Sequence, residues 1–394
     1  MFLCILSRHS NAVTIIFVND PYDVQDSIKG EEHASRSFIN GSKNVYINST
    51  DELPSKTNMS KFFANKSNKI RLQSFLKTSF QDFSSSYPEK EFIYSIQRNC
   101  EDLKSGINLP AYECDHQEAD TIIFYIVHAL TQINFGNAIV IDAEDTDVIV
   151  LSSFVSLRET GILAFQRKKA TFDCSKLCAP NLSSIIVKLH VLTGCDYTSG
   201  FFGRGKKAVI KNVLKNMEQA QLLLEELGET LTVNEIVYAK VTLFVLRFVY
   251  NDKKSKTLAE ARCAAWKRMK KKSTQRLPPD EDSMRGHISR CNYAIYMNLQ
   301  YRSANALESP RTHGWIGQNG IFIPRRYQNP ALPPPMNIPE QLDEAEDNHN
   351  ERSSENEDED VEDDFIRESD TDNENADDDL SADDDLSADD DTEE

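Results

Sequence analysis

The sequence of 394 residues carries a set of carboxylates between positions 118 and 196, each at the edge of an apolar segment. Mg²⁺ and Mn²⁺ prefer oxygen ligands, and two such ions can activate water and stabilise the leaving oxygen when a phosphodiester is cleaved. The residue types and their spacing therefore predict a site for two Mg²⁺ or Mn²⁺ ions. Its candidate ligands are Glu118, Asp120, Asp145, Asp147 and Asp196.

Ordinary structural roles compete with this interpretation for some of these acids. Glu118 and Asp120 begin an apolar helical run, where acidic side chains act as caps and interact favourably with the helix macrodipole. The segment 142–147 differs, because it has four acids in six residues between two apolar elements. Like charges packed there are unfavourable unless cations compensate them. We therefore do not interpret this segment as a solvated run of charge.

Asp20 is a further candidate ligand because of its position. Residues 13–18 are β-branched and apolar, which predicts a buried strand, and the turn Asn19-Asp20-Pro21 ends it. In open α/β sheets, ligands bind at the carboxyl ends of the strands. The alternative is a turn aspartate before a proline, and position alone favours that alternative.

A glycine-rich basic turn follows the last acid of the set. Gly203-Arg204-Gly205 precedes a predicted helix that starts with Lys206 and Lys207. Such a turn at a helix N-terminus presents backbone N–H groups and positive charge to a phosphate. The three basic residues are therefore candidates for contacts with a nucleic-acid backbone. Loop glycines before helices are common and lysines are often only solvated, so the turn alone is a weak signal.

The charge of the chain is divided between a body and a tail. Residues 340–394 contain about 29 acids and 2 Arg, so the preceding residues carry about +8 although the whole chain carries −19. A mildly basic body suits a phosphate-backbone partner. The tail repeats Asp-Leu-Ser-Ala-Asp-Asp from positions 379 and 385 and has too little apolar surface to fold. It is expected to bind a basic protein, to cover the body's own basic groove, or only to increase solubility.

Other features of the composition exclude several classes of protein. The eight cysteines are scattered without a Cys-x2-Cys pair, so we expect reduced thiols in an intracellular protein. Cys174 and Cys178 with His190 lack the spacing and the second ligand pair of a zinc site. No apolar run reaches roughly 18 residues, so we expect no membrane partner. A basic cluster at 267–272 indicates a nuclear protein or a backbone contact, although a solvated helix end is equally consistent.

The apolar periodicity predicts one αβα body of class α/β, with a mixed or parallel sheet and helices on both faces. Strands are expected at 13–18, 44–48, 91–96 and 138–141, with an antiparallel pair at 161–165 and 170–172 and a hairpin at 314–324. Helices are expected at 59–83 (one or a pair), 118–132, 182–192, 206–217, 218–249, 257–272 and 284–299. Residues 148–154 fit either state. Residues 1–6 are expected to be a strand, or the start of a chain that lacks upstream sequence.

The ordered motifs resemble those of the flap-endonuclease superfamily, the structure-specific 5′ nucleases built on a PIN-like core. The likeness runs from about residue 13 to residue 214. The family's Glu-x-Glu pair is similar to residues 118–120, its Glu-Asp-x-Asp to residues 144–147, and its Gly-Cys-Asp-Tyr is intact at 194–197. The chain is still more similar to a group of uncharacterised PIN-like animal proteins, common in invertebrates. They share Glu-Ala-Asp-Thr, Asp-Thr-Asp-Val and Leu-Thr-Gly-Cys-Asp, here at 118–121, 145–148 and 192–196.

The resemblance implies a fold and a reaction. It implies a PIN-like core with a mainly parallel sheet over 1–217, including a helix–turn–helix element at 193–217. A helical extension over 218–330 and a disordered linker and acidic tail over 331–394 would follow. The implied reaction is metal-dependent hydrolysis of DNA phosphodiesters at a flap or a single-strand/duplex junction. The implied metal ligands are Asp20, Glu118, Asp120, Asp145, Asp147 and Asp196; Lys29 and Arg36 would stabilise the phosphate, and Arg204, Lys206 and Lys207 would hold the duplex.

Two departures from the family pattern favour a different function. The family's first metal-ligand Asp lies near its N-terminus, and residues 1–12 contain no counterpart. Loss of one carboxylate can lower metal affinity roughly tenfold. The glycine turn is also one residue short, which weakens the case for the family's K⁺ site. The alternative is a catalytically impaired nucleic-acid-binding or scaffold protein of mobile-element origin that keeps the fold, or a decayed remnant that folds poorly.

Overall fold

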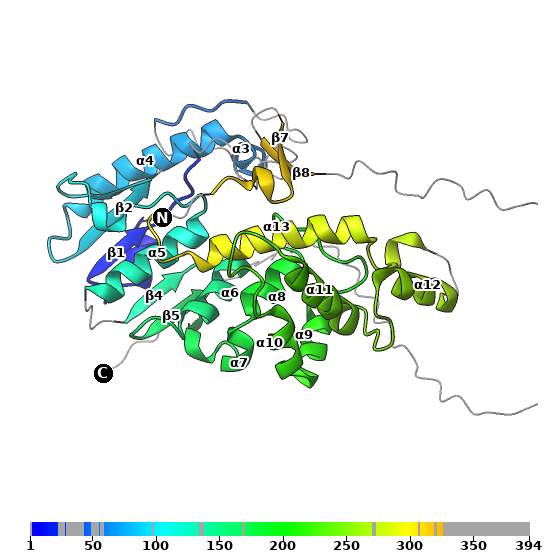
Figure 1. The fold of residues 1–394 in the computed structure, drawn as a ribbon. Coiled ribbons are helices and arrows are strands. Elements are labelled where there is room, and N and C mark those ends of the chain that lie inside the picture. Colours follow the sequence, from blue (N-terminus) through cyan, green and yellow to red (C-terminus); the bar gives the residue numbers. More distant parts are fainter. Residues whose placement is uncertain are drawn as a thin grey trace, which may run out of the picture. The chain divides into compact units, whose positions relative to one another are not determined.

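The computed structural model describes residues 2–22, 28, 43–48, 55, 59–96, 98–133, 138–167, 170–269, 273–305, 308–318 and 321–325. The chain forms two compact units, residues 1–331 and residues 332–394. Every described residue belongs to the first unit. This unit combines helices with short sheets, as the predicted α/β class requires (Figure 1).

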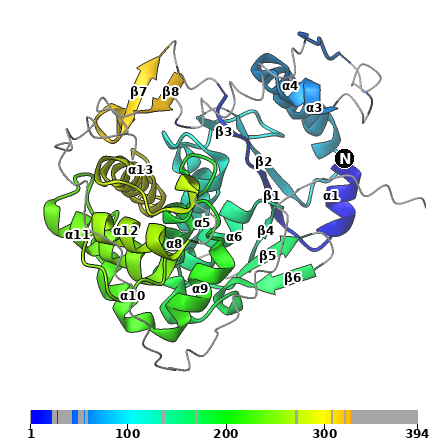
Figure 2. The same cartoon turned by 90° about the vertical axis from the view of Figure 1, so that its right-hand side faces the viewer.

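Two three-stranded sheets form the strand layer. In the first, β1 (Thr14–Phe17) pairs parallel with β2 (Glu91–Ile96), which pairs antiparallel with β3 (Asn99–Asp102). In the second, β4 (Ile139–Asp142) pairs parallel with β5 (Leu163–Arg167), which pairs antiparallel with β6 (Ala170–Asp173). The two sheets meet where β1 lies beside β4 (Figure 2). Ile16, Val18 and Ile139 are partly buried there and pack against the same buried cluster.

Helices cover both faces of the first sheet. Successive strand side chains point to opposite faces, so Ile15 and Ile16 of β1 enter different clusters. Ile15 packs with Leu6 of α1 (Phe2–Arg8) and with α4 (Lys66–Ser84). Ile16 packs with Ile122 of α5 (Ala119–Gln132). The sheet thus lies between α1 and α4 on one side and α5 on the other.

The remaining helices lie mainly beyond the second sheet. The α-helices are α3 (Met59–Phe63), α6 (Thr146–Val155), α7 (Pro180–Ser183), α8 (Ile186–Leu192), α9 (Lys206–Lys215), α10 (Met217–Leu224), α11 (Glu235–Phe244), α12 (Leu258–Arg268) and α13 (Glu281–Leu299). A π-helical turn, Val245–Val249, continues α11. Short 3₁₀ helices occupy Pro110–Tyr112, Cys174–Lys176, Thr274–Arg276 and Pro310–Thr312, and β7 (Trp315–Gln318) pairs antiparallel with β8 (Ile321–Pro324).

One large buried cluster joins distant parts of the sequence. Phe124 of α5 and Leu151 of α6 belong to the same cluster as Leu189 of α8, Val209 of α9 and Ile288 of α13. Burial of apolar side chains is the dominant favourable contribution to folding, at about 25 cal/mol per Å². The helices after residue 217 therefore share their core with the helices before it.

The structure differs from two predicted strands. Residues 44–48 form no strand, and the backbone of Val45 bonds to α4 instead: its N–H donates to Asn68 Oδ1 at 2.8 Å, and Arg71 donates to its carbonyl at 3.2 Å. The start of the chain forms helix α1, so the strand predicted at 1–6 is also wrong. Leu6 of this helix is buried on the sheet.

Three ambiguous or continuous helical patterns are resolved by the structure. Residues 148–154 belong to helix α6, which begins at its N-cap residue Asp145. The helix predicted at 182–192 is divided into α7 and α8. At 59–83, where one helix or a pair was expected, the structure has the pair α3 and α4, with Asn65 as the N-cap of α4.

All eight cysteines are free thiols, as their scattered positions predicted. Over the described ranges, no helix is both long enough and apolar enough to span a membrane.

Candidate functional site

The candidate site depends on how α5 and α6 are oriented. Near the C-terminal end of α5, His128 Nδ1 lies 3.1 Å from Glu159 Oε2, and the Thr131 hydroxyl donates to the same oxygen at 3.0 Å. Glu159 follows the C-terminal end of α6. The two packed helices therefore end together, so their N-terminal ends point to the same side of the layer.

Helix α8 runs in the opposite direction to α6. The Ser183 hydroxyl, just before α8, donates to the Ser153 carbonyl late in α6. At the other end of α8, His190 contacts Asp147 in the first turn of α6. The end of α8, from which the chain continues to Asp196, therefore lies at the N-terminal end of α6. The predicted acidic segments on α5, α6 and α8 share one end of this helix layer.

Asp20 lies at the N-terminus of α5. Its Oδ1 accepts the backbone N–H of Ala119 at 2.8 Å, and its Oδ2 accepts the Tyr22 hydroxyl at 3.1 Å. Glu118 is the N-cap residue of α5, but its side chain does not cap the helix. Asp120 lies in the first turn. The structure thus brings Asp20 to Glu118 and Asp120, and it gives Asp20 a structural role as well.

Asp145 and Asp147 occupy the N-terminus of α6. Asp145 is the N-cap, and its Oδ1 accepts the Asp147 N–H at 2.8 Å. Asp147 Oδ1 lies 2.8 Å from His190 Nε2, and the two side chains are only 15% and 9% exposed. Because both groups are largely shielded from water, removing either one would leave the other buried without this partner.

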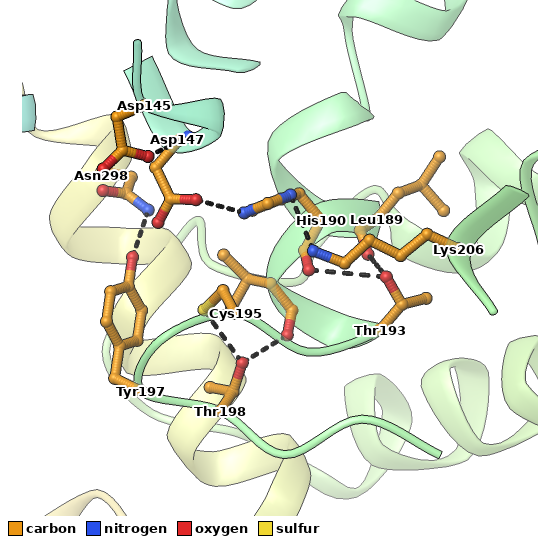
Figure 3. Close-up of polar contacts among 11 residues, drawn as sticks. Asp145, Asp147, Leu189, His190, Thr193, Cys195, Tyr197, Thr198, Lys206 and Asn298 are labelled. Atoms are coloured by element: carbon orange, nitrogen blue, oxygen red, sulfur yellow. Dashed lines mark hydrogen bonds and ion pairs between the residues drawn. The ribbon is translucent and has the colours of Figure 1, made fainter. Parts of the chain in front are cut away.

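His190 connects Asp147 to Lys206 at the start of α9. Its Nδ1 lies 3.0 Å from Lys206 Nζ (Figure 3). An ammonium group can only donate, so Nδ1 accepts and the neutral ring carries its hydrogen on Nε2, which donates to Asp147. Asp147, His190 and Lys206 therefore form a continuous hydrogen-bonded chain across α6, α8 and α9.

Lys206 lies within the site instead of on its rim. Burial lowers the pKa of Lys206, while the nearby Cys195, Asp147 and Asp196 act in the opposite direction. Lys206 reaches Asp147 through His190, and Asp196 follows the end of α8 that carries this histidine. The sequence predicted a duplex contact for Lys206, whereas in the structure its side chain contacts His190.

The loop that carries Asp196 is held tightly. Gly194 has φ +110°, and a Cβ at this position would lie 2.8 Å from the Gly200 backbone. The Thr198 hydroxyl donates to the Val191 carbonyl at 2.7 Å. The Tyr197 hydroxyl accepts from Asn298 of α13 at 3.1 Å (Figure 3). Loop residues on either side of Asp196 thus have fixed partners.

The other predicted basic residues fall into two groups. Arg204 and Lys207 are exposed, and the Arg204 guanidinium lies 5.1 Å from the centroid of the Tyr250 ring. Both remain accessible to a nucleic-acid backbone. Lys29 and Arg36, the predicted phosphate-stabilising pair, lie outside the described residues.

The donor chemistry suits Mg²⁺ or Mn²⁺, because the predicted ligands are carboxylates gathered at one end of a helix layer. Their spacing is less favourable: in the described part of the chain, no group of three or more His, Cys, Asp or Glu residues is placed to hold a metal ion. One oxygen of Asp147 already pairs with His190. The residues therefore match the ions in ligand type, while a tight cluster would need local rearrangement.

Two features of the site were not predicted from the sequence. His190 was considered only as a poor zinc ligand, although a histidine in the last turn of an apolar helix, six residues before Asp196, is a usable signal. Asp142 at the end of β4 pairs with Arg8 at 3.0 Å and with His9 at 2.8 Å. No pattern in the sequence indicates that α1 compensates the charge of this acid.

Comparison of the chain with protein-family models, with curated proteins and with solved structures finds no match. The site geometry therefore has to support any functional conclusion by itself.

Proposed function

We propose that this protein is a divalent-metal-dependent nuclease-like hydrolase with a PIN-like core, acting on DNA. The observation that supports the proposal is the convergence of acids from separate segments. Asp20 contacts the N-terminus of α5, and His190 joins Asp147 in the first turn of α6 to the end of α8, from which the chain continues to Asp196. Such a concentration of negative charge is unfavourable unless cations compensate it.

The chain's own residues would divide the work. Asp20, Glu118 and Asp120 would hold an ion from the α5 side, and Asp145, Asp147 and Asp196 from the α6 side. When bound, such ions supply Lewis acidity toward water and toward the leaving oxygen.

The basic residues beside the site would bind the polymer. Arg204 and Lys207 are exposed near the start of α9, on either side of Lys206 in the sequence, and backbone phosphates would bind there. His190 would orient Asp147 by donating to one of its oxygens. Substrate would thus be held by cations at the edge of an acidic site.

The test is a cleavage assay on the full chain. Fluorescent single-stranded and flap DNA are incubated with Mn²⁺ or Mg²⁺, and the products are resolved on a denaturing gel. Asp145→Asn with Asp147→Asn removes two charges, and asparagine still caps a helix. We expect wild-type cleavage that depends on metal and is lost by at least a hundredfold in the double variant.

Asp82→Asn is the matched control, because Asp82 is an exposed acid in the last turn of α4 and is not one of the candidate ligands. Its cleavage rate should equal that of the wild type. Equal cleavage by the double variant, or cleavage that persists in a chelator, would refute the proposed site.

A second candidate function is nucleic-acid binding without catalysis. It is favoured by Lys206, which already compensates the acids at this end of α6, and by the lack of a three-ligand cluster in the described residues. Salt-dependent DNA binding together with no metal-dependent cleavage would select this function.

A further inference from the structure

The amine of Lys206 is a positive charge that lies within the acidic candidate site. It belongs to the first residue of α9, yet it contacts a histidine of α8 and not the solvent in front of the helix. Its neighbour Lys207 is exposed. Two adjacent lysines at one helix start therefore have different environments, and only one of them lies among the acids.

The contacts of His190 fix the direction of that amine. One ring nitrogen lies 2.8 Å from Asp147 Oδ1 and the other lies 3.0 Å from Lys206 Nζ (Figure 3). The His190 side chain is only 9% exposed, so the ring is held by packing as well as by these bonds. His190 therefore acts as a rigid spacer that holds a cation near the acids.

The charges that face this cation are mainly negative. Asp147 bonds to the histidine that holds this amine, and Asp196 follows the end of the same helix α8. A cation that is tethered to the chain reduces the repulsion between carboxylates, as a bound metal ion would. A divalent ion that enters the site would be repelled by this amine, because both cations would interact with the same carboxylates.

We propose that Lys206, positioned by His190, is a built-in counter-ion of the acidic site that competes with divalent metal for Asp147 and Asp196. This inference rests on the proposed metal site. Entry of metal beside the carboxylates would repel the amine from its place at His190 and leave it, beside Arg204 and Lys207, available to a backbone phosphate. Metal binding and nucleic-acid binding would then reinforce each other.

The test uses thermal melting of the full chain over a series of MnCl₂ concentrations. The acidic residues at 340–394 also attract Mn²⁺, but only binding that depends on the folded state raises the melting temperature. Lys206→Met removes the charge and keeps an unbranched side chain. We expect this variant to melt lower without metal, and to need about tenfold less Mn²⁺ than the wild type for the same upward shift.

Two further variants make the comparison specific. Lys207→Met makes the same change in net charge one residue away and should respond to Mn²⁺ as the wild type does. Lys206→Arg keeps the cation and should also stay close to the wild type.

The possible results separate this inference from the proposed function. If Mn²⁺ stabilises the wild type and Lys206→Met equally, Lys206 is not a competing counter-ion, while the metal site stands. If Lys207→Met matches Lys206→Met, a general charge effect replaces the inference. If Mn²⁺ stabilises none of the proteins, the metal site and the inference are both wrong.

Discussion

The carboxylate of Asp20 and the backbone N–H of Ala119 are joined by a 2.8 Å hydrogen bond, although 99 positions separate them in the sequence. A side chain from the end of β1 thus performs the role that a local N-cap usually has for α5. Asp20→Ala removes the acceptor and should lower the free energy of unfolding by about 1 kcal/mol. Urea denaturation measures the change.

Asp20→Asn serves as the control for this effect. Its amide oxygen still accepts the Ala119 N–H, so most of the stability should remain while the negative charge is lost. Equal destabilisation by both substitutions would show that the charge, and not the hydrogen bond, links β1 to α5.

Gly194 gives a prediction about the loop of Asp196. Its φ of +110° is unfavourable for other residues, and an added Cβ would lie 2.8 Å from the Gly200 backbone, which cannot move aside as a flexible side chain can. Gly194→Ala should cost about 3 kcal/mol. Gly203→Ala is the matched control, because Gly203 has φ +70° but nothing within 4 Å, and about 1 kcal/mol is expected. Equal melting temperatures for the two variants would contradict the predicted clash.

His287 should make the fold sensitive to acid. Burial lowers the pKa of His287 to about 4, while its Nε2 hydrogen bond to the Leu192 carbonyl opposes that shift. The unfolded chain binds a proton near pH 6.5 and the folded chain does not, so stability falls between pH 6.5 and about 4 and levels off below. The loss from this group is about 3 kcal/mol.

His287→Gln tests this assignment. The variant keeps a donor toward Leu192 but does not titrate, so its urea midpoint should depend less on pH between 6.5 and 4. An unchanged pH profile would assign the acid sensitivity to another group. Because Leu192 directly precedes the Asp196 loop, the same titration should loosen the loop.

Glu159 should stabilise the opposite end of the α5–α6 layer. Its side chain is 5% exposed. Burial raises the pKa of Glu159, but a set of hydrogen bonds outweighs burial and the pKa lies below its usual range; the donors are Tyr301, His128, Arg302 and Thr131. Glu159→Gln should cost about 2 kcal/mol at pH 7, because charge-assisted hydrogen bonds are lost.

The direction of the pH effect follows from the lowered pKa. Glu159 contributes its full stability above the pKa of the unfolded carboxyl, near 4.3, and loses it as the pH falls through the folded value. The difference between wild type and Glu159→Gln should therefore shrink in acid. A difference that stays constant down to pH 2 would indicate a packing defect instead.

Arg204 and Lys207 give a prediction for the nucleic-acid interface. If each neutralises one phosphate, Arg204→Gln with Lys207→Gln should weaken DNA binding for every sequence. The slope of log affinity against log salt should fall by about 2. Fluorescence anisotropy at several salt concentrations measures the slope. An unchanged slope would remove these residues from the interface.

The local elements were largely predictable, because their patterns are local. The strand at 91–96 and the helix at 118–132 follow from apolar periodicity and are confirmed. Residues 44–48 have the same β-branched character, but Asn68 and Arg71 of a later helix satisfy the Val45 backbone and no strand forms. A pattern cannot show which partner a backbone will find.

The sequence predicted the acidic residues of the site, but not the contacts that its basic residues make. The positions of Asp145 and Asp147 follow from a motif at a strand end, and they do lie at the N-terminus of α6. The contact between His190 and Asp147 depends on α8 running against α6, which no local signal encodes. The contact between Lys206 and His190 depends on the same packing, and no local pattern in the sequence predicted it.

The contacts between α13 and the end of α8 also affect when the site can form during synthesis of the chain. His287 and Leu192 are 95 residues apart, and Asn298 reaches Tyr197 across a similar interval. A ribosome must therefore synthesise the chain through α13 before the loop of Asp196 gains its final support. During synthesis, the acidic centre stays unfinished until α13 has emerged from the exit tunnel.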